Sequence, residues 1–257
     1  MAEDSTRTTA TIVIPCYNEE RRLDVGAFVE LSTTPGLSLL FVDDGSSDRT
    51  PEILAGLASA SDSIEVLVLT RNVGKGNAIR EGVRRVMEGE TAIVGYLDAD
   101  LATPASELLR LLRVLESDPS LSVVMGSRVK RLGSHIERST LRHMVGRVYA
   151  TVAAFALGVS VYDTQCGAKV MRVSPALRVG FEKPFGSSWS FDAWLLARLM
   201  RGSDAVRGLA VEEFCEVSLL EWREVPGSKL RLRHALRAFG DLALLALRRV
   251  RARRRAR

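Results

Sequence analysis

Short apolar runs recur along the first half of the chain, and each is followed by a stretch of mixed polar and apolar positions. The runs predict β-strands at residues 11–15, 37–42, 64–69, 92–97 and 121–125. The stretches between them have the length and spacing of amphipathic helices. Strands that are apolar on both faces and alternate with helices are typical of a parallel sheet covered by helices. The pattern therefore predicts an α/β fold with a mostly parallel, Rossmann-like sheet.

Two of these helices have recognisable starts, at Thr50-Pro51 and Thr103-Pro104. In each, we expect the threonine to cap the helix and the proline to take its first position. After residue 126 the alternation weakens. In this second half, the spacing of apolar residues predicts a helix at 139–158, a strand at 168–173, a helix at 191–200, an extended segment at 206–217 and a final helix at 230–257. Without a linker or repeat, we expect one domain at 8–229 and a tail at 230–257.

The final helix is amphipathic and strongly basic. Its apolar residues recur at spacings of three and four, and its last ten residues hold seven arginines. Such a helix suits an anionic membrane surface, although a core-packed helix with a basic tail is the alternative. The net charge of +5 is concentrated here, so the body lacks the charge of a nucleic-acid binder.

Three features of the chain indicate its compartment. The uncharged run 148–161, even with Tyr162 added, is shorter than the roughly 20 residues that cross a bilayer. The polar N-terminus lacks the apolar core of a signal peptide. The three cysteines are widely spaced, without the CxxC pairs of a zinc site, and fit a reducing compartment. We therefore expect a cytoplasmic protein that is peripheral on the inner face of the cell membrane.

Pairs of acidic residues follow two of the predicted strands. Asp98 and Asp100 end the run at 92–97, and Asp43 and Asp44 end the run at 37–42. Like charges this close repel each other unless a cation lies between them. Magnesium or manganese, held by one or two carboxylates and a substrate phosphate, would explain Asp98 and Asp100. The plainer alternatives are helix-capping acids for this pair and a turn for Asp43 and Asp44.

Other polar segments lie at the same predicted edge of the sheet. The segment 14–20 turns from a strand toward a helix, and Lys75 lies in a glycine-containing loop that lacks the P-loop spacing. Arg128 directly follows a strand, where its guanidinium could hold phosphate oxygens. Arg138, Arg142 and Arg147 either join it or line a solvated helix face. Asp163 and Asp192 could contact a sugar, or they could belong to a turn and a helix cap.

Taken together, these segments resemble the family 2 glycosyltransferases with the GT-A fold, and within them the polyprenyl-phosphate glycosyl synthases near the dolichyl-phosphate β-glucosyltransferase branch. The matching segments are Ile14-Pro15-Cys16-Tyr17-Asn18-Glu19-Glu20, Val42-Asp43-Asp44-Gly45-Ser46, Asn72-Val73-Gly74-Lys75-Gly76, Asp98-Ala99-Asp100, Gly126-Ser127-Arg128, Asp163-Thr164-Gln165-Cys166-Gly167 and Gly227-Ser228-Lys229-Leu230. Each segment alone is weak evidence for the family, but all seven occur in the order typical of the family, and that combination is specific.

The resemblance implies roles for individual residues. Asp98 and Asp100 would hold Mg²⁺ or Mn²⁺, and Asp100, Asp192 and Arg128 would act in catalysis. The nucleotide sugar would contact a larger set: Pro15, Tyr17, Glu19, Asp43, Asp44, Lys75, Asp98, Asp163 and Gln165. The acceptor phosphate would contact a basic set: Arg128, Arg138, Arg142 and Lys229.

The implied activity is inverting transfer of a hexose from a nucleotide-diphosphate sugar, UDP-glucose being favoured, to polyprenyl monophosphate. The lipid-linked sugar would serve cell-envelope glycan or glycoprotein assembly. A mannose or N-acetylgalactosamine synthase of the same fold is the nearest alternative. A non-catalytic sugar-nucleotide binding protein is the alternative from another class. A pyrophosphorylase would need a glycine-rich first loop, and a processive synthase a QxxRW motif; the sequence has neither.

Overall fold

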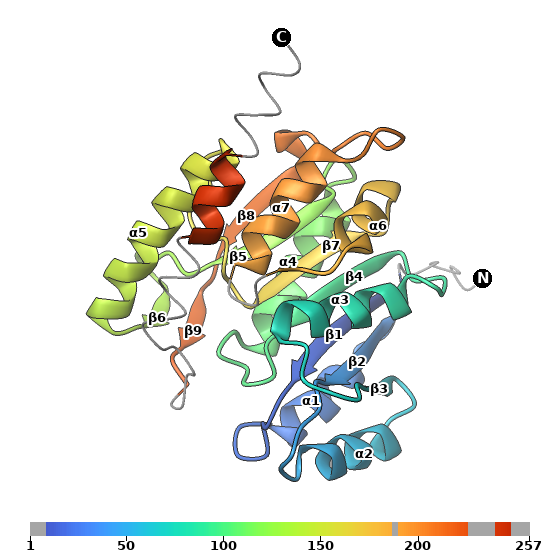
Figure 1. Cartoon of the computed structure of the whole chain (residues 1–257). Helices are drawn as coiled ribbons and strands as arrows, with labels where there is room; N and C mark the ends of the chain where they lie inside the picture. The colour runs from blue at the N-terminus through green and yellow to red at the C-terminus, as the bar shows by residue number, and fades with distance from the viewer. Residues whose placement is uncertain (1–8, 187–189, 226–239, 248–257) are drawn as a thin grey trace, which may run out of the picture.

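A computed structural model of the chain describes residues 9–186, 190–225 and 240–247. Its centre is a seven-stranded sheet in the order β3-β2-β1-β4-β7-β5-β8, beside a small sheet of β6 and β9 (Figure 1). The strands are β1 Ala10–Cys16, β2 Leu37–Asp43, β3 Ile64–Val68, β4 Ile93–Leu97, β5 Val123–Ser127, β6 His135–Glu137, β7 Ala168–Arg172, β8 Phe214–Ser218 and β9 Glu221–Arg223. The predicted α/β fold with a mostly parallel sheet is confirmed.

Helices cover both faces of the large sheet. They are α1 Val25–Ser32, α2 Thr50–Ala60, α3 Lys75–Val86, α4 Ala105–Ser117, α5 Thr140–Leu157, α6 Pro175–Glu182 and α7 Phe191–Arg201, with the 3₁₀ turn η1 at Val211–Glu213. One core layer joins α1, α2 and α4 to the sheet through residues such as Phe28, Leu54 and Leu108. The opposite layer joins α3, α6 and α7 through Ile79 and Phe181, among others. Burial of these apolar side chains is the main stabilising contribution.

Strand β7 is the exception to the parallel pattern. It lies between β4 and β5 and runs antiparallel to both, whereas β1 pairs in parallel with β2 and β4. Because β7 is reversed, the loop that precedes it lies at the same edge as the carboxyl ends of β4 and β5. That loop carries Asp163 and Gln165, so strand order places them beside Asp98 and Arg128.

The helix starts differ from the prediction. The N-cap of α2 is Arg49, and the Thr50 hydroxyl instead accepts a hydrogen bond from the Glu19 amide at 2.8 Å. The N-cap of α4 is Pro104, and no side chain caps this helix. Both expected threonine caps are therefore wrong. The Thr50 hydroxyl instead connects the start of α2 to the loop after β1.

The second half of the chain contains elements that the pattern did not predict. Helix α6 and the short strands β6 and β9 were missed, and η1 interrupts the segment predicted as extended at 206–217. Of the predicted helix at 230–257, residues 240–247 are described and are helical, packing through Leu242 and Leu245 against the apolar cluster of α5 and α7. The other tail residues lie outside the described part of the chain.

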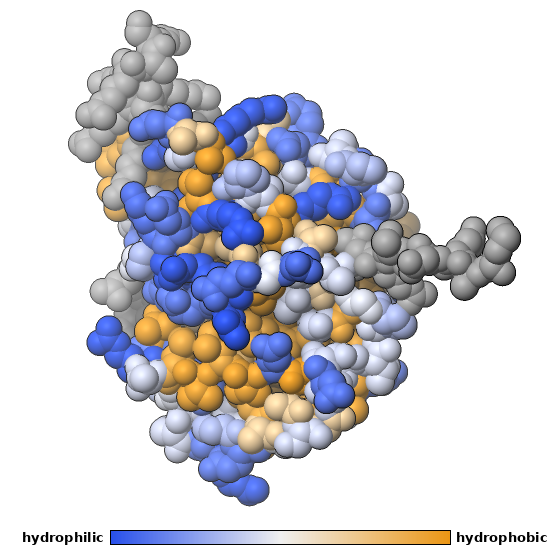
Figure 2. Space-filling model, turned by 90° about the vertical axis from the view of Figure 1, so that its right-hand side faces the viewer, coloured by the Kyte–Doolittle hydropathy of each residue, from blue (hydrophilic) through white to orange (hydrophobic). Residues whose placement is uncertain are grey.

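The sheet ends at β3 on one side of the molecule. Figure 2 views this side, where apolar surface gathers in the lower half of the view among hydrophilic side chains. Val68 at the end of β3 is 63% exposed, and β3 has only five residues, a length that limits pairing at an open edge. Within the described residues, no helix is both long enough and apolar enough to cross a membrane.

Candidate active site

The first part of the site is the turn region after β1 and β2. The buried carboxylate of Asp44 accepts hydrogen bonds from the Val73 amide at 2.6 Å and the Gly74 amide at 2.9 Å. Gly74 has a positive φ of 85°, a conformation that glycine adopts without a Cβ clash. Burial raises the pKa of Asp44 although the two amides oppose the shift. Asp44 thus holds in place the loop that leads into α3.

Neighbouring side chains close the two turns against each other. Asp43 accepts from the Ser46 amide at 3.0 Å, and the Ser46 hydroxyl accepts from the Asn18 amide at 3.0 Å. Pro15 lies opposite Val42 in the strand register. The predicted nucleotide-binding residues of β1 and β2 therefore gather at one sheet edge: Pro15, Tyr17, Glu19, Asp43 and Asp44.

The acidic pair after β4 lies next to this region. Lys75, the first residue of α3, places its Nζ 2.5 Å from Asp98 Oδ1. Asp100 Oδ2 lies 3.4 Å from Arg22 Nη1, and Asp100 Oδ1 accepts from the Ala102 amide at 3.2 Å. Burial, and then the charge of Asp98, raise the pKa of Asp100. Two partly buried carboxylates therefore lie close together here, with Lys75 and Arg22 as cationic neighbours.

The donor set at this point fits a divalent cation with an anionic substrate. Among the described residues, no group of three or more His, Cys, Asp and Glu side chains is arranged to hold a metal ion. Magnesium, however, is usually held by one or two carboxylates together with substrate phosphates. Asp98 and Asp100 are two such carboxylates, and a cation between them would reduce the repulsion that, after burial, contributes to the raised pKa of Asp100.

A glycine leaves room for the Asp98 carboxylate. A Cβ on Gly167 would lie 2.3 Å from Asp98 Oδ2. The Gly167 carbonyl also accepts a hydrogen bond from the Asp98 amide at 3.0 Å. The loop before β7 is therefore packed directly against the acidic pair, and any side chain at position 167 would displace one or the other.

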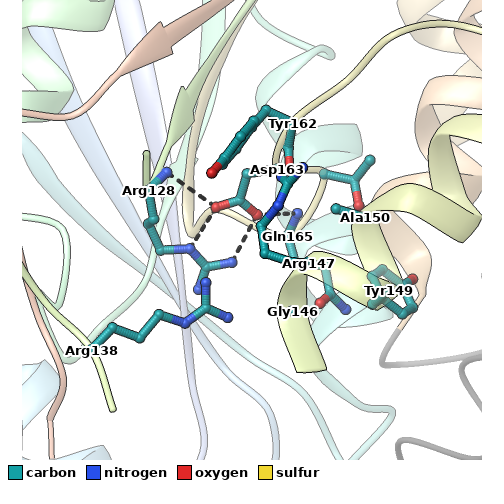
Figure 3. A pocket seen from close by; sticks show the side chains of 10 residues that line it. Arg128, Arg138, Gly146, Arg147, Tyr149, Ala150, Tyr162, Asp163 and Gln165 are labelled. Atoms are coloured by element: carbon teal, nitrogen blue, oxygen red, sulfur yellow. Dashed lines mark hydrogen bonds and ion pairs between the residues drawn. The ribbon is translucent and has the colours of Figure 1, made fainter. Parts of the chain in front are cut away.

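On the far side of that loop, Arg128 and Asp163 form a buried ion pair. Arg128 Nε and Nη2 lie 2.6 and 2.8 Å from the two Asp163 oxygens, and the Arg128 amide donates to Oδ2 at 3.2 Å (Figure 3). Burial alone would raise the pKa of Asp163, but the Arg128 guanidinium outweighs it and holds that pKa well below its usual range. The pair fixes Arg128 in one orientation.

Arg128 belongs to a small cavity with a strongly basic lining. Arg138 and Arg147 line it together with Asp163 and Gln165 (Figure 3). The Arg147 guanidinium lies 3.7 Å from the centre of the Tyr162 ring and donates to the Tyr162 carbonyl at 3.2 Å. Three guanidinium groups around one cavity form a potential anion-binding site.

The remaining predicted site residues have different surroundings. The backbone of Arg142 lies in α5, but its side chain, like the whole of Lys229, falls outside what the structure describes. Asp192 lies in the first turn of α7 and is buried. Its Oδ1 accepts hydrogen bonds from the Tyr96 hydroxyl and from Lys169 Nζ, the latter at 2.6 Å.

Sequence reasoning missed Arg22, Tyr96 and Lys169. Arg22 gave no strong signal, because it stands in a short charged stretch before a helix. Tyr96 reads as an ordinary apolar strand residue. A lysine inside an apolar strand, as Lys169 is between Ala168 and Val170, was a usable signal because lysine is rarely buried without a partner.

The sheet and its covering helices have the GT-A fold, and the family match agrees with it. Residues 11–180 match the model of glycosyl transferase family 2. This match spans more than half of the chain, and the chain belongs to that family.

Curated relatives place the chain within the family. It is 30% identical to the dolichyl-phosphate beta-glucosyltransferase of Homo sapiens, over 88% of this chain and 71% of the relative. It is 33% identical to the undecaprenyl-phosphate 4-deoxy-4-formamido-L-arabinose transferase of Yersinia enterocolitica, over 67% of this chain and 51% of the relative. The chain is therefore a family 2 glycosyltransferase near the dolichyl-phosphate β-glucosyltransferase branch.

A solved structure shares the fold. The chain superposes on glucosyl-3-phosphoglycerate synthase from Mycobacterium tuberculosis, solved with Mn²⁺, UDP and phosphoglyceric acid, with a TM-score of 0.66. The match covers 93% of this chain and 79% of the synthase at 18% identity. At that identity, the likeness concerns the GT-A fold alone.

Proposed function

We propose that this glycosyltransferase moves a hexose from a nucleotide-diphosphate sugar, with UDP-glucose as the favoured donor, to polyprenyl monophosphate. The observation that carries the proposal is the order of groups along one sheet edge. The Asp44 turn, the Asp98–Asp100 pair and the arginine-lined cavity follow one another from β2 to β5. This order matches a nucleoside, its diphosphate and an acceptor phosphate.

The chemistry is a single displacement at the anomeric carbon. An oxygen of the acceptor phosphate bonds to C1 of the sugar as the bond from C1 to the nucleoside diphosphate breaks, with inversion at C1. The acceptor is already an anion, so no strong general base is needed. A divalent cation, when bound at Asp98 and Asp100, offsets the charge that develops on the leaving diphosphate.

The residues of the chain supply position and charge. Lys75, whose Nζ lies beside the Asp98 carboxylate, would offset part of the charge of the diphosphate. Arg128, oriented by Asp163, would hold the acceptor phosphate together with Arg138 and Arg147. Such preorganised charges lower the barrier because they need no rearrangement during the reaction. Asp192 would orient the sugar or the acceptor.

We also propose that the enzyme works at a membrane surface, on its cytoplasmic side. Helix α5 exposes Met144, Val148 and Phe155, which are 61, 56 and 80% exposed. The helical segment 240–247 exposes Leu244 and Leu247. Apolar residues on two helices that pack together, ahead of an arginine-rich end, would suit the headgroup region of an anionic bilayer. The resulting lipid-linked sugar would serve cell-envelope glycan or glycoprotein assembly.

A donor screen tests the proposal. The purified full chain is incubated with polyprenyl phosphate, Mg²⁺ or Mn²⁺, and one donor at a time: UDP-glucose, UDP-galactose, UDP-N-acetylgalactosamine or GDP-mannose. Mass analysis of the lipid phase should show one added hexose with UDP-glucose and none after chelation of the metal. If the product forms from GDP-mannose or UDP-N-acetylgalactosamine instead, that nucleotide sugar replaces UDP-glucose as the proposed donor. No lipid product from any donor would contradict the acceptor assignment.

A further inference from the structure

Lys169 is a fully buried cation in the central sheet. It lies on β7, and none of its side-chain surface is exposed. A buried ammonium is costly unless each of its three donors has a partner. Here Nζ donates to Asp192 Oδ1 at 2.6 Å, to the Thr164 carbonyl at 2.8 Å and to the Cys166 carbonyl at 3.0 Å. All three donors are satisfied, so the group has one well-defined position.

These partners come from different parts of the fold. Thr164 and Cys166 belong to the loop before β7, and Asp192 lies in the first turn of α7. The Tyr96 hydroxyl of β4 donates to the same Asp192 oxygen, and its ring lies 5.2 Å from Lys169 Nζ. One ammonium group therefore connects β7, β4, α7 and the loop. Since it has no path to solvent, it cannot reach a substrate itself.

The loop held by Lys169 separates the two charged centres of the site. At one end, Gly167 packs against the Asp98 carboxylate. At the other end, Asp163 fixes Arg128 through both of its oxygens. The position of this loop therefore determines the separation between the acidic pair and the arginine-lined cavity. Loss of the ammonium would release two loop carbonyls and leave Asp192 without its counter-charge.

We propose that Lys169 is a positioning residue for sugar transfer. Its ammonium holds the 163–167 loop and Asp192 so that Asp98 and Arg128 stand at the separation that the reaction needs. This inference deepens the proposed function and rests on it for its kinetic part. A purely structural role would instead make Lys169 one more contributor to stability, without a particular effect on the chemical step.

The test compares Lys169→Met with a matched buried cation. Arg80 is 7% exposed and donates to the Glu182 carbonyl between α3 and α6, away from the 163–167 loop. Both variants should be less stable than the wild type. We expect Lys169→Met to lose about 10- to 100-fold in kcat with the donor KM nearly unchanged, because a misplaced group chiefly raises the barrier. Arg80→Met should keep the wild-type kcat at a temperature where both variants are folded.

Hydrogen exchange gives a readout that does not depend on activity. In full-length protein without donor or acceptor, the amides of 163–167 should exchange about tenfold faster in Lys169→Met, and at wild-type rates in Arg80→Met. Equal exchange at this loop in the two variants, or equal loss of kcat, would overturn the proposal. A wild type that makes no lipid product would contradict the proposed function alone, because the exchange result would still stand.

A second pair of variants covers the case in which Lys169→Met does not fold. Replacing a whole buried ion pair is tolerated better than removing one partner. Lys169→Met is therefore combined with Asp192→Asn and compared with Asp192→Asn alone. If Lys169 positions the loop, the double variant should have at least about tenfold lower kcat and faster exchange at 163–167. Identical kcat and exchange in the two proteins would refute the positioning role.

Discussion

Arg128 and Asp163 are separated by 35 residues in the sequence, yet they form a two-point ion pair with oxygen–nitrogen distances of 2.6 and 2.8 Å. Each is at most 15% exposed, so neither charge is well solvated without the other. The pair places a guanidinium group in the basic cavity in one orientation. It joins the loop after β5 to the loop before β7, and so ties the two halves of the candidate acceptor site together.

This pair should give the enzyme a particular dependence on pH. The pKa of Asp163 lies well below that of a free carboxyl group, about 3.8, so its contribution to stability is fully present above that value. It is lost as pH falls further, because protonation of Asp163 breaks the pair. Asp163→Asn should be about 3–5 kcal/mol less stable at pH 7, with the difference shrinking below about pH 4.

Urea unfolding at a series of pH values checks this expectation. The exposed Asp204 serves as the control, since Asp204→Asn should leave the free energy of unfolding nearly unchanged at every pH. A difference between the wild type and Asp163→Asn that stays constant down to pH 3 would contradict the assignment.

Asp100→Asn should abolish transfer while making the metal-free protein more stable. Because the pKa of Asp100 is raised, the native state binds its proton more tightly than the unfolded state does. Stability therefore falls as pH rises from about 3.8 through the raised pKa, and ionised Asp100 is a net cost at pH 7. Removing it should raise Tm by about 2–4 °C, which corresponds to about 1 kcal/mol.

Addition of Mn²⁺ distinguishes the effect of Asp100 on the stability of the metal-free protein from its role in binding the metal. It should raise the Tm of the wild type by mass action and leave that of Asp100→Asn almost unchanged. Transfer by Asp100→Asn near the wild-type rate would rule out the proposed metal site.

Gly167→Ala should inactivate the enzyme. The added Cβ would lie 2.3 Å from Asp98 Oδ2, so either the loop or the carboxylate must move. We expect kcat to fall about 100-fold, the loss that follows a displacement of about 1 Å at a reacting centre. Gly56→Ala is the matched control. A Cβ there meets nothing within 4 Å, and alanine is the better helix former, so activity should be kept.

The exposed face of α5 should contribute to membrane association. In a variant with Met144→Ser, Val148→Ser and Phe155→Ser, sedimentation with anionic vesicles should fall by about tenfold or more, because each apolar side chain is worth about 1.5–3 kcal/mol when buried. Donor binding should not change. Val211→Ser, at a residue that is 52% exposed on η1, is the control. Unchanged sedimentation of the triple variant would argue against this face as the membrane contact.

Much of the fold follows from the pattern of apolar residues. The runs that became β1, β2, β4 and β5 were visible because most of their residues are buried on both faces of the sheet, and the run that became β3 was visible from its apolar residues although it lies at the sheet edge. The place of β7 was not visible, since an apolar strand does not reveal its direction or its neighbours. The helix starts at Thr50 and Thr103 were misjudged because a threonine beside a proline fits a cap equally well whether or not its hydroxyl has another partner.

In the candidate site, too, some features could be predicted from the sequence and others could not. Asp44, Asp98 and Arg128 stood out because charged residues at the ends of buried strands need a reason to be there. Lys75 and Asp163 were also candidates, but the sequence did not predict which of these residues pair. Lys75 meets Asp98 and Asp163 meets Arg128 only after the chain has folded, and the sequence distance between partners gives no hint of this. The resemblance to family 2 named most of these residues, but it did not reveal the buried connection through Lys169.

The position of β7 also sets an order of events during synthesis. Strands β1 to β4 can pair as soon as they leave the ribosome, because each neighbour in the sheet has already been made. Strand β5 must wait, since it reaches β4 only through β7, which emerges about 45 residues later. At about 5–20 residues per second, the apolar β5 spends several seconds without its partner. A nascent chain stalled before Ala168 would therefore carry a paired β1–β4 sheet and an unpaired strand β5 open to chaperones.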